Sequence, residues 1–110
     1  MKTIIIESYT VYVGQTKKEN WELLDESNAS DIFFHLRSFP SGYVIMKSKE
    51  GDVPSQKVLN QCAQLCKQHT KYKRMSSLYV DYTPCDNLIK GNNVGEVIYK
   101  SNRKVNKLWC

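Results

Sequence analysis

Apolar and polar side chains alternate over short stretches of this chain, and the alternation predicts strands separated by turns. Residues 9–14 are an example, because Tyr9, Val11 and Val13 recur at every second position and Gly14 ends the run. The same reasoning predicts further strands at residues 3–7, 32–34, 43–46, 76–83, 94–100 and 104–109. Residues 86–93 are expected to form a loop between two of these strands.

The two apolar runs at residues 32–34 and 43–46 flank a turn with the sequence Phe39-Pro40-Ser41-Gly42. Proline presets φ at one turn position, and glycine can adopt the positive φ that a neighbouring position often needs. Both runs are rich in aromatic and β-branched residues, which favour strands. We therefore expect two consecutive strands that form a hairpin with a longer loop.

Two other stretches have the periodicity of helices. Thr16 and Glu19 have the spacing of a capping box, which predicts a short helix over residues 17–25. Pro54 precedes a longer stretch, residues 55–69, whose apolar side chains recur on one side at helical spacing. Strands and helices in this order predict an α+β fold, with a mainly antiparallel sheet of about six strands and one long and one short helix packed on it.

The length of 110 residues is that of one domain, so we expect a single domain over residues 1–110. The apolar run at residues 4–6 is too short for a secretory signal or a membrane-spanning segment. A cytoplasmic protein is therefore expected. Residues 1–56 hold six Lys/Arg and eight Asp/Glu, a net charge of −2, whereas residues 57–110 hold ten and three, a net charge of +7. The basic half favours an anionic partner on one face, although a solvated surface has a similar composition.

The sequence contains no Gly-rich phosphate loop, no HExxH motif and no GxSxG motif, so we expect neither an enzyme nor a cofactor. The four cysteines are scattered along the chain, which favours free thiols over disulfides. Cys62 and Cys66 are one helical turn apart, but both lie on the apolar side of the longer helix, where cysteine behaves as a small hydrophobic residue. No metal site is therefore expected.

His35 and Arg37 are two residues apart and should lie on the same side of a strand. Arginine can bind a phosphate with two parallel hydrogen bonds, and histidine can donate to a base or stack on it. Lys47 and Lys49 leave the partner strand with the same alternation and extend this candidate site. Spacing alone favours a plainer interpretation, namely a histidine bonded within the structure and a solvated arginine.

Lys17, Lys18 and Asn20 lie at the start of the predicted short helix, where free backbone N–H groups attract phosphate. An ordinary exposed helix start, with Asn20 bonded to nearby backbone, explains the same pattern. Lys90 is a weaker candidate, in a loop that also contains glycine and asparagine.

A basic stretch follows the longer helix: Lys71, Lys73 and Arg74 surround Tyr72. Proteins that bind single strands combine cations with an aromatic side chain in this way. A solvated helix end is the more common use of such a run of charges, and the sequence alone favours it.

Several blocks of sequence, in order and over nearly the whole chain, together form a more specific signal. They are Tyr12-Val13-Gly14, Asn20 with Leu23, Asp31-Ile32-Phe33-Phe34-His35-Leu36-Arg37, Pro40-Ser41-Gly42-Tyr43-Val44, Pro54 with the helix over residues 58–66, Val80-Asp81-Tyr82-Thr83-Pro84 and Gly95-Glu96-Val97-Ile98-Tyr99. This pattern resembles the NFACT RNA-binding (NFACT-R) domain of ribosome-quality-control tail-elongation factors, fibronectin-binding-like bacterial proteins and a eukaryotic coiled-coil-domain protein. That family usually has tryptophan at the position of Phe33, and two small residues and a histidine where this chain has Ser41-Gly42-Tyr43.

The resemblance implies a nucleic-acid-binding module whose ligand is RNA, such as tRNA or ribosomal RNA, with a link to translation or ribosome-associated quality control. It does not imply peptide-tail synthesis, which in the larger family members requires other domains. It also makes the binding roles of His35, Arg37 and Lys17 about as well supported as their structural roles. Two alternatives remain: a protein-interaction module that docks a ribosomal or acidic partner, and a DNA-binding or DNA-sensing domain.

Overall fold

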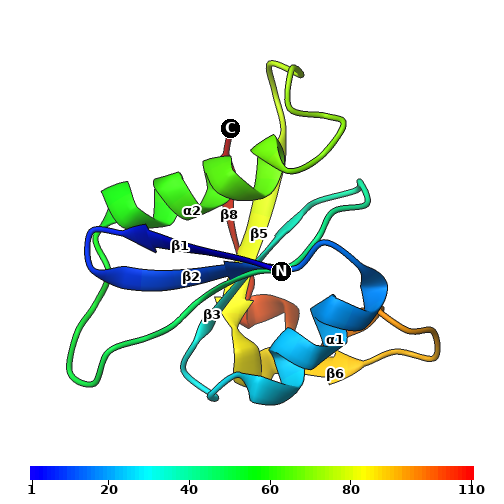
Figure 1. Cartoon of the computed structure of the whole chain (residues 1–110), viewed down its shortest axis with the longest axis horizontal. Coiled ribbons are helices and arrows are strands. Elements are labelled where there is room, and N and C mark those ends of the chain that lie inside the picture. Colours follow the sequence, from blue (N-terminus) through cyan, green and yellow to red (C-terminus); the bar gives the residue numbers. More distant parts are fainter.

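A six-stranded antiparallel sheet, in the order β1-β2-β4-β3-β5-β8, forms the centre of the computed structural model, which describes residues 1–110. Its strands are β1 (Lys2–Ile6), β2 (Tyr9–Val13), β3 (Ile32–Leu36), β4 (Val44–Met46), β5 (Tyr79–Pro84) and β8 (Asn106–Trp109). Helix α2 (Gln56–Gln68) lies across one face of the sheet, and α1 (Lys17–Glu26) lies on the other side, near β6 (Leu88–Lys90) (Figure 1). Strand β6 pairs only with β7 (Val97–Tyr99), in a separate two-stranded sheet.

Side chains alternate between two cores because successive residues of a strand point to opposite faces. Phe34 and Val44 belong to the larger core, of 15 buried residues, which α2 covers. Their chain neighbours Phe33 and Ile45 belong to a smaller core of six buried residues, beneath α1 and the β6–β7 pair. Both faces of the central strands are therefore buried, which explains their nearly continuous apolar sequences.

The structure confirms the α+β fold, with its mainly antiparallel sheet and its two helices. The predicted hairpin is present, with Phe33 opposite Ile45 in the β3–β4 pair. The Thr16 hydroxyl accepts from the Glu19 N–H at 3.1 Å, as expected at the start of α1. Neither helix has both the length and the apolar character needed to cross a bilayer.

Two local predictions are wrong. The expected loop at residues 86–93 instead begins within a 3-10 helix, Cys85–Asn87, and contains β6. Asn87 holds Ser101 by two hydrogen bonds of 2.9 Å and so brings β7 alongside β6. The expected strand at residues 94–100 is shortened to Val97–Tyr99, because Gly95 has a φ of +87° and a turn precedes the strand.

Glycine is required at two positions because three segments cross closely at the end of β2. A Cβ atom on Gly42 would lie 2.2 Å from the Gly14 carbonyl oxygen, and a Cβ atom on Gly14 would lie 2.1 Å from Asn20 Oδ1. Hydrogen bonds link the same segments, since the Gly14 N–H donates to the Tyr43 carbonyl at 2.9 Å and the Tyr43 N–H donates to Asn20 Oδ1 at 3.1 Å. In this turn the positive φ belongs to Ser38, at 69°, and Gly42 is needed for close approach instead.

We expect Gly42→Ala to lower the free energy of unfolding by about 2 to 3 kcal/mol, because the added methyl group meets backbone that cannot move aside. Urea unfolding measures this loss. Gly51→Ala is the matched control: Gly51 has a φ of +73° but nothing within 4 Å of the added Cβ. It should lose only about 1 kcal/mol, from backbone strain. Equal losses in the two variants would contradict the close crossing.

Candidate nucleic-acid interface

Three adjoining hollows surround the turn after β3, and Pro40 lines all of them. We call their combined surface the Pro40 groove. Its polar and aromatic lining includes Lys17, Asn20, His35, Arg37, Ser41, His69, Lys71, Tyr72, Asp81, Glu96 and Tyr99. Residues from α1, β3, the end of α2 and the loop before β7 thus meet on one surface, although they are far apart in the sequence.

Helix α1 contributes a free cation and an oriented amide to the Pro40 groove. Lys17 is exposed and has no carboxylate within 4 Å. Asn20 is buried, and its Oδ1 accepts from the Tyr43 N–H. That bond fixes the amide so that Nδ2, which makes no hydrogen bond within the chain, is left as a donor. Asn20 therefore has the structural role that the sequence left open, and it also presents a donor to a ligand.

His35 is a neutral side chain in this site. Its Nδ1 donates to the Leu36 carbonyl at 2.7 Å, and its ring stacks on Phe33 with centroids 5.9 Å apart. Burial lowers the His35 pKa, and it outweighs the opposing effects of the Leu36 carbonyl and Asp81. At neutral pH the other ring nitrogen, Nε2, is therefore an acceptor, and His35 contributes shape and a lone pair instead of positive charge.

Arg37 is held in place by an ion pair. Its Nε donates to Asp81 Oδ1 at 2.7 Å, while the Tyr99 hydroxyl donates to Asp81 Oδ2 at 3.4 Å. Asp81 is only 8% exposed, so Arg37 mainly neutralises this carboxylate. The two terminal nitrogens of the Arg37 guanidinium have no protein partner, and the side chain is 42% exposed. It can therefore still donate to an anion, but it adds little net charge.

The chain after α2 forms the other wall of the Pro40 groove. Tyr72 is half-buried, and its ring packs on Phe39 with centroids 4.6 Å apart. Lys71 lies over the Tyr72 ring, with Nζ 5.5 Å from its centroid, and lines the groove. Lys73 and Arg74 are exposed, have no acidic partner and continue along the same loop. Lys71 and Lys17 are thus the unpaired cations of the groove itself.

The structure does not bring the remaining candidate lysines to the Pro40 groove. Lys18 Nζ lies 3.9 Å from Glu22 in the next turn of α1. Lys90 is paired with Asp25 at 2.6 Å and lies over the Trp21 ring. Lys49 lies over the Tyr9 ring near the Ser8 hydroxyl, beyond the opposite end of β4.

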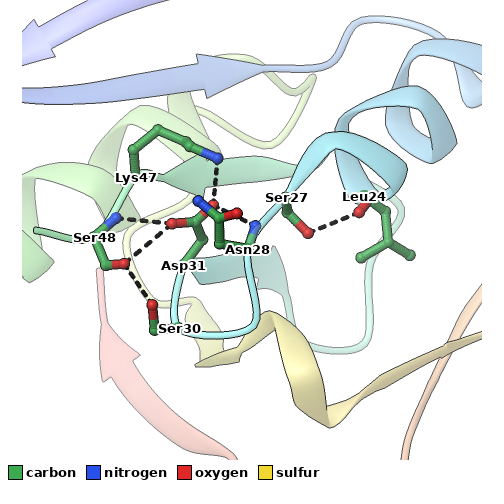
Figure 2. Close-up of polar contacts among 7 residues, drawn as sticks. All are labelled: Leu24, Ser27, Asn28, Ser30, Asp31, Lys47 and Ser48. Carbon is green, nitrogen blue, oxygen red and sulfur yellow. Dashed lines mark hydrogen bonds and ion pairs between the residues drawn. The ribbon is translucent and has the colours of Figure 1, made fainter. Parts of the chain in front are cut away.

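Lys47 has a structural partner, the fully buried carboxylate of Asp31. Figure 2 shows this cluster: Lys47 Nζ lies 2.5 Å from Asp31 Oδ2, which also accepts from the Asn28 N–H at 2.8 Å. The Ser48 N–H and hydroxyl both donate to Asp31 Oδ1, at 2.9 and 3.2 Å (Figure 2). This network joins the segment before β3 to the end of β4, so Lys47 stabilises the sheet.

The sequence did not indicate the contribution of the loop at residues 93–96. The Gly95 carbonyl accepts from the Tyr43 hydroxyl at 2.5 Å, which brings the loop over the groove. Glu96 adds a carboxylate there, but it is bonded to the Asn92 N–H at 3.2 Å and to Asn93 Nδ2 at 3.4 Å. The only signal for this loop in the sequence was the pair Gly95-Glu96, which closely follows Asn92 and Asn93.

All four cysteines are free thiols, and no group of three or more His, Cys, Asp or Glu side chains is arranged to hold a metal ion. Cys62 and Cys66 lie in the larger core, and burial raises the pKa of each to about 12. Cys85 lies in the smaller core, where burial raises its pKa to about 11. Cys110 is partly exposed, and its pKa is also raised by burial.

Fold and site together define an α+β domain with a partly basic groove beside the turn of its central hairpin. The chain belongs to the NFACT protein RNA binding domain family, whose model matches residues 3–102. This confirms the resemblance found in the sequence.

Similar proteins occur in several kingdoms. The chain is 32% identical to a coiled-coil domain-containing protein 25 homolog of Dictyostelium discoideum, over 93% of this chain and 52% of that protein. It is 33% identical to Protein JLP2 of Saccharomyces cerevisiae, over 93% of this chain and 53% of that protein. The Rqc2 homolog RqcH of Bacillus subtilis is 29% identical over 92% of this chain and 19% of that protein. The chain thus spans about half or less of the length of these relatives.

The fold also matches a solved structure, the C-terminal part of the fibronectin/fibrinogen-binding protein from Streptococcus suis. The TM-score is 0.83 at 22% identity, over 97% of this chain and 43% of the other. This likeness establishes the fold alone.

Replacing Lys47 by methionine leaves the buried Asp31 carboxylate without its counterion. We expect the free energy of unfolding at pH 7 to fall by about 2 to 4 kcal/mol. This is a little less than the loss expected on breaking a fully buried ion pair, because the Lys47 side chain is partly exposed. Lys49→Met, at an exposed position, should change it by less than about 0.5 kcal/mol. Because Lys47 is engaged with Asp31, any RNA binding by the folded Lys47→Met protein should equal that of wild type. A loss of about tenfold or more would show that Lys47 belongs to the interface.

The same variant tests the pH dependence. Burial tends to raise the Asp31 pKa, but Lys47 and the backbone N–H groups of Asn28 and Ser48 outweigh it and hold the pKa below its usual value. The stabilisation from Asp31 is therefore present above about pH 4 and is lost as the pH falls through the lowered pKa. We expect the stability difference between wild type and Lys47→Met to shrink from pH 7 to about pH 3, because protonated Asp31 needs no counterion. A constant difference would contradict this assignment.

The raised thiol pKa values predict that the native protein reacts slowly with thiol reagents. With Ellman's reagent at pH 8, we expect only the partly exposed Cys110 to react within minutes, and all four thiols to react in denaturant. A Cys110→Ser variant should then show no fast phase. Fast reaction of Cys62 or Cys66 in the native protein would show that the larger core opens.

Proposed function

We propose that this chain is a non-enzymatic RNA-binding module that binds tRNA or ribosome-associated RNA through the Pro40 groove. The observation that carries the proposal is the meeting of two unpaired cations, Lys17 and Lys71, on a groove that also offers donors from Asn20 and Arg37. Membership of a family defined as an RNA binding domain supports RNA as the ligand.

The chemistry of the groove suits a phosphate backbone that passes over a shaped surface. Lys17 and Lys71 can attract phosphates because no carboxylate lies within 4 Å of either, and the exposed Lys73 and Arg74 continue the positive charge along the loop after Lys71. His35 and Tyr72 supply ring surface for stacking or for a hydrogen bond to a base, which contributes modest sequence preference. Affinity should therefore be salt-dependent, because bound phosphates release counterions.

The similarity to RqcH supports a role in translation or ribosome-associated quality control, in the cytoplasm, with RNA or the ribosome as the partner. Peptide-tail synthesis is no part of this proposal, because the chain corresponds to 19% of RqcH.

A charge-reversal experiment tests the groove. Lys17→Glu/Lys71→Glu should weaken tRNA binding at least tenfold, and should reduce the slope of log affinity against log salt by about two, because each lysine contributes one phosphate contact. The measurement is fluorescence anisotropy with labelled tRNA, single-stranded RNA and duplex DNA at about 50 and 200 mM salt. Arg37 is not changed in this experiment, because its removal would leave the buried Asp81 carboxylate without its counterion.

The matched control is Lys49→Glu/Lys57→Glu, which makes the same charge change at the opposite end of the sheet and at the start of α2. It should keep most of the affinity. Equal losses in both double variants would mean that charge acts generally and not through the groove. Stronger binding of duplex DNA than of RNA would identify a DNA-binding domain, and weak, salt-tolerant binding of all three would favour a protein-interaction module.

A further inference from the structure

Arg37, Tyr79 and Trp109 form a row on the face of the sheet that α2 does not cover. Arg37 directly follows β3, whereas Tyr79 and Trp109 belong to β5 and β8. The Arg37 N–H donates to the Tyr79 carbonyl at 2.9 Å, and Tyr79 is paired with Trp109 on β8. The adjacent row contains His35, Asp81 and Lys107. Because Arg37, His35 and Asp81 line the Pro40 groove, this face continues the groove towards the sheet edge.

The aromatic pair on this face is exposed and contributes to neither core. Trp109 is 59% exposed and Tyr79 is 37% exposed, with ring centroids 4.5 Å apart at an interplanar angle of 66°. Their chain neighbours Val80 and Leu108 point the other way, into the larger core. The folding of the domain therefore does not explain why two large rings stand together in solvent.

One cation lies against these rings, and two more lie at the far end of β8. Lys107 Nζ lies 4.5 Å from the centroid of the Tyr79 ring. Arg103 and Lys104, just before β8, are exposed, and no carboxylate lies within 4 Å of any of these three cations. The carboxylate on this face, Asp81, is already neutralised by Arg37. A ligand for this surface would therefore combine negative charge with flat, apolar rings.

The basic turn before β8 is held rigidly against the end of β5 that is remote from the rings. The Thr83 hydroxyl donates to the Lys104 carbonyl at 2.8 Å. Asn87 binds both the carbonyl and the N–H of Ser101, each at 2.9 Å. These bonds involve buried side chains of β5 and of the following 3-10 helix, so the cations are positioned on the fold and not on a free tail.

We propose that Tyr79 and Trp109 form a stacking platform for an unpaired base of single-stranded RNA. Lys107 would contact the adjoining phosphate, and Arg103 and Lys104 would contact phosphates farther along the strand. This inference rests on the proposed function and extends it: the ligand has a single-stranded segment that leaves the Pro40 groove across Arg37. Neighbouring strands are about 4.8 Å apart, so the backbone of Tyr79 lies about 5 Å from Arg37 and that of Trp109 about 10 Å, within reach of one continuous RNA strand. Aromatic stacking tolerates any base, so little sequence preference is expected at the platform.

The test uses the fluorescence of Trp109. The chain has two tryptophans, so Trp21→Phe leaves Trp109 as the only one. Titration with a short single-stranded RNA should quench this emission. An abasic oligonucleotide of the same length, which keeps the phosphates but lacks the bases, should bind by anisotropy without equal quenching. A blunt-ended duplex RNA should also quench little.

Substitution gives the second arm. Trp109→Ala should weaken single-stranded RNA binding about five- to 150-fold, the range expected for losing one stacked base. Trp109→Phe, which keeps a ring, should recover most of that affinity. The matched control is Ile98→Ala, because Ile98 is an apolar side chain of similar exposure, 55%, on β7. It should leave binding unchanged.

The outcomes separate the platform from the groove. RNA binding that depends on Lys17 and Lys71 but is indifferent to Trp109, without quenching, would overturn the platform and leave the proposed function intact. Absence of RNA binding would overturn both. Quenching by the abasic oligonucleotide equal to that by RNA would also overturn the stacking proposal. So would a shift of Trp109 emission with protein concentration alone, which would identify the rings as a contact between copies of the chain.

Discussion

The arrangement of this domain depends on the close crossing of backbone at Gly14 and Gly42. Two glycines allow the end of β2 and the turn before β4 to approach within a distance that any side chain would prevent. Asn20 then joins α1 to the same point by accepting from the Tyr43 N–H. Because Tyr43 also reaches the Gly95 carbonyl, one crossing positions four segments that surround the Pro40 groove.

Buried polar groups divide the basic residues into structural and free ones. Asp31 and Asp81 are buried carboxylates in neighbouring segments of the sheet, and each needs a cation because an unpaired charge is costly in a low-dielectric environment. Lys47 and Arg37 fill that need. Net charge therefore overstates the charge available for binding, and the cations left for a ligand are those with no carboxylate within 4 Å. Lys17 and Lys71 meet this condition inside the groove, and Lys107 meets it on the open face of the sheet.

Much of the fold was predictable from local patterns. The hairpin of β3 and β4, the capping box of α1 and the apolar side of α2 all depend on neighbours within a few positions, and each formed where expected. Strand β6 was missed because Leu88–Lys90 is too short to show a period, and it is a strand only because β7 pairs with it. Of the candidate site, Lys17, Asn20, His35, Arg37 and Tyr72 line one groove, whereas Lys47, Lys49 and Lys90 have partners elsewhere.

The sequence by itself determined the class of fold, the family and the excess of positive charge, because periodicity, ordered motifs and composition are properties of the chain alone. Only the tertiary structure decided which charges are free. Asp31 lies 16 positions before Lys47, and Asp81 lies 44 positions after Arg37, so neither ion pair has a local signature. Likewise, Tyr79 and Trp109 become neighbours only when β5 and β8 pair. Ion pairs and stacked rings act over a few ångströms in space, and folding sets those distances by joining segments that the sequence keeps apart.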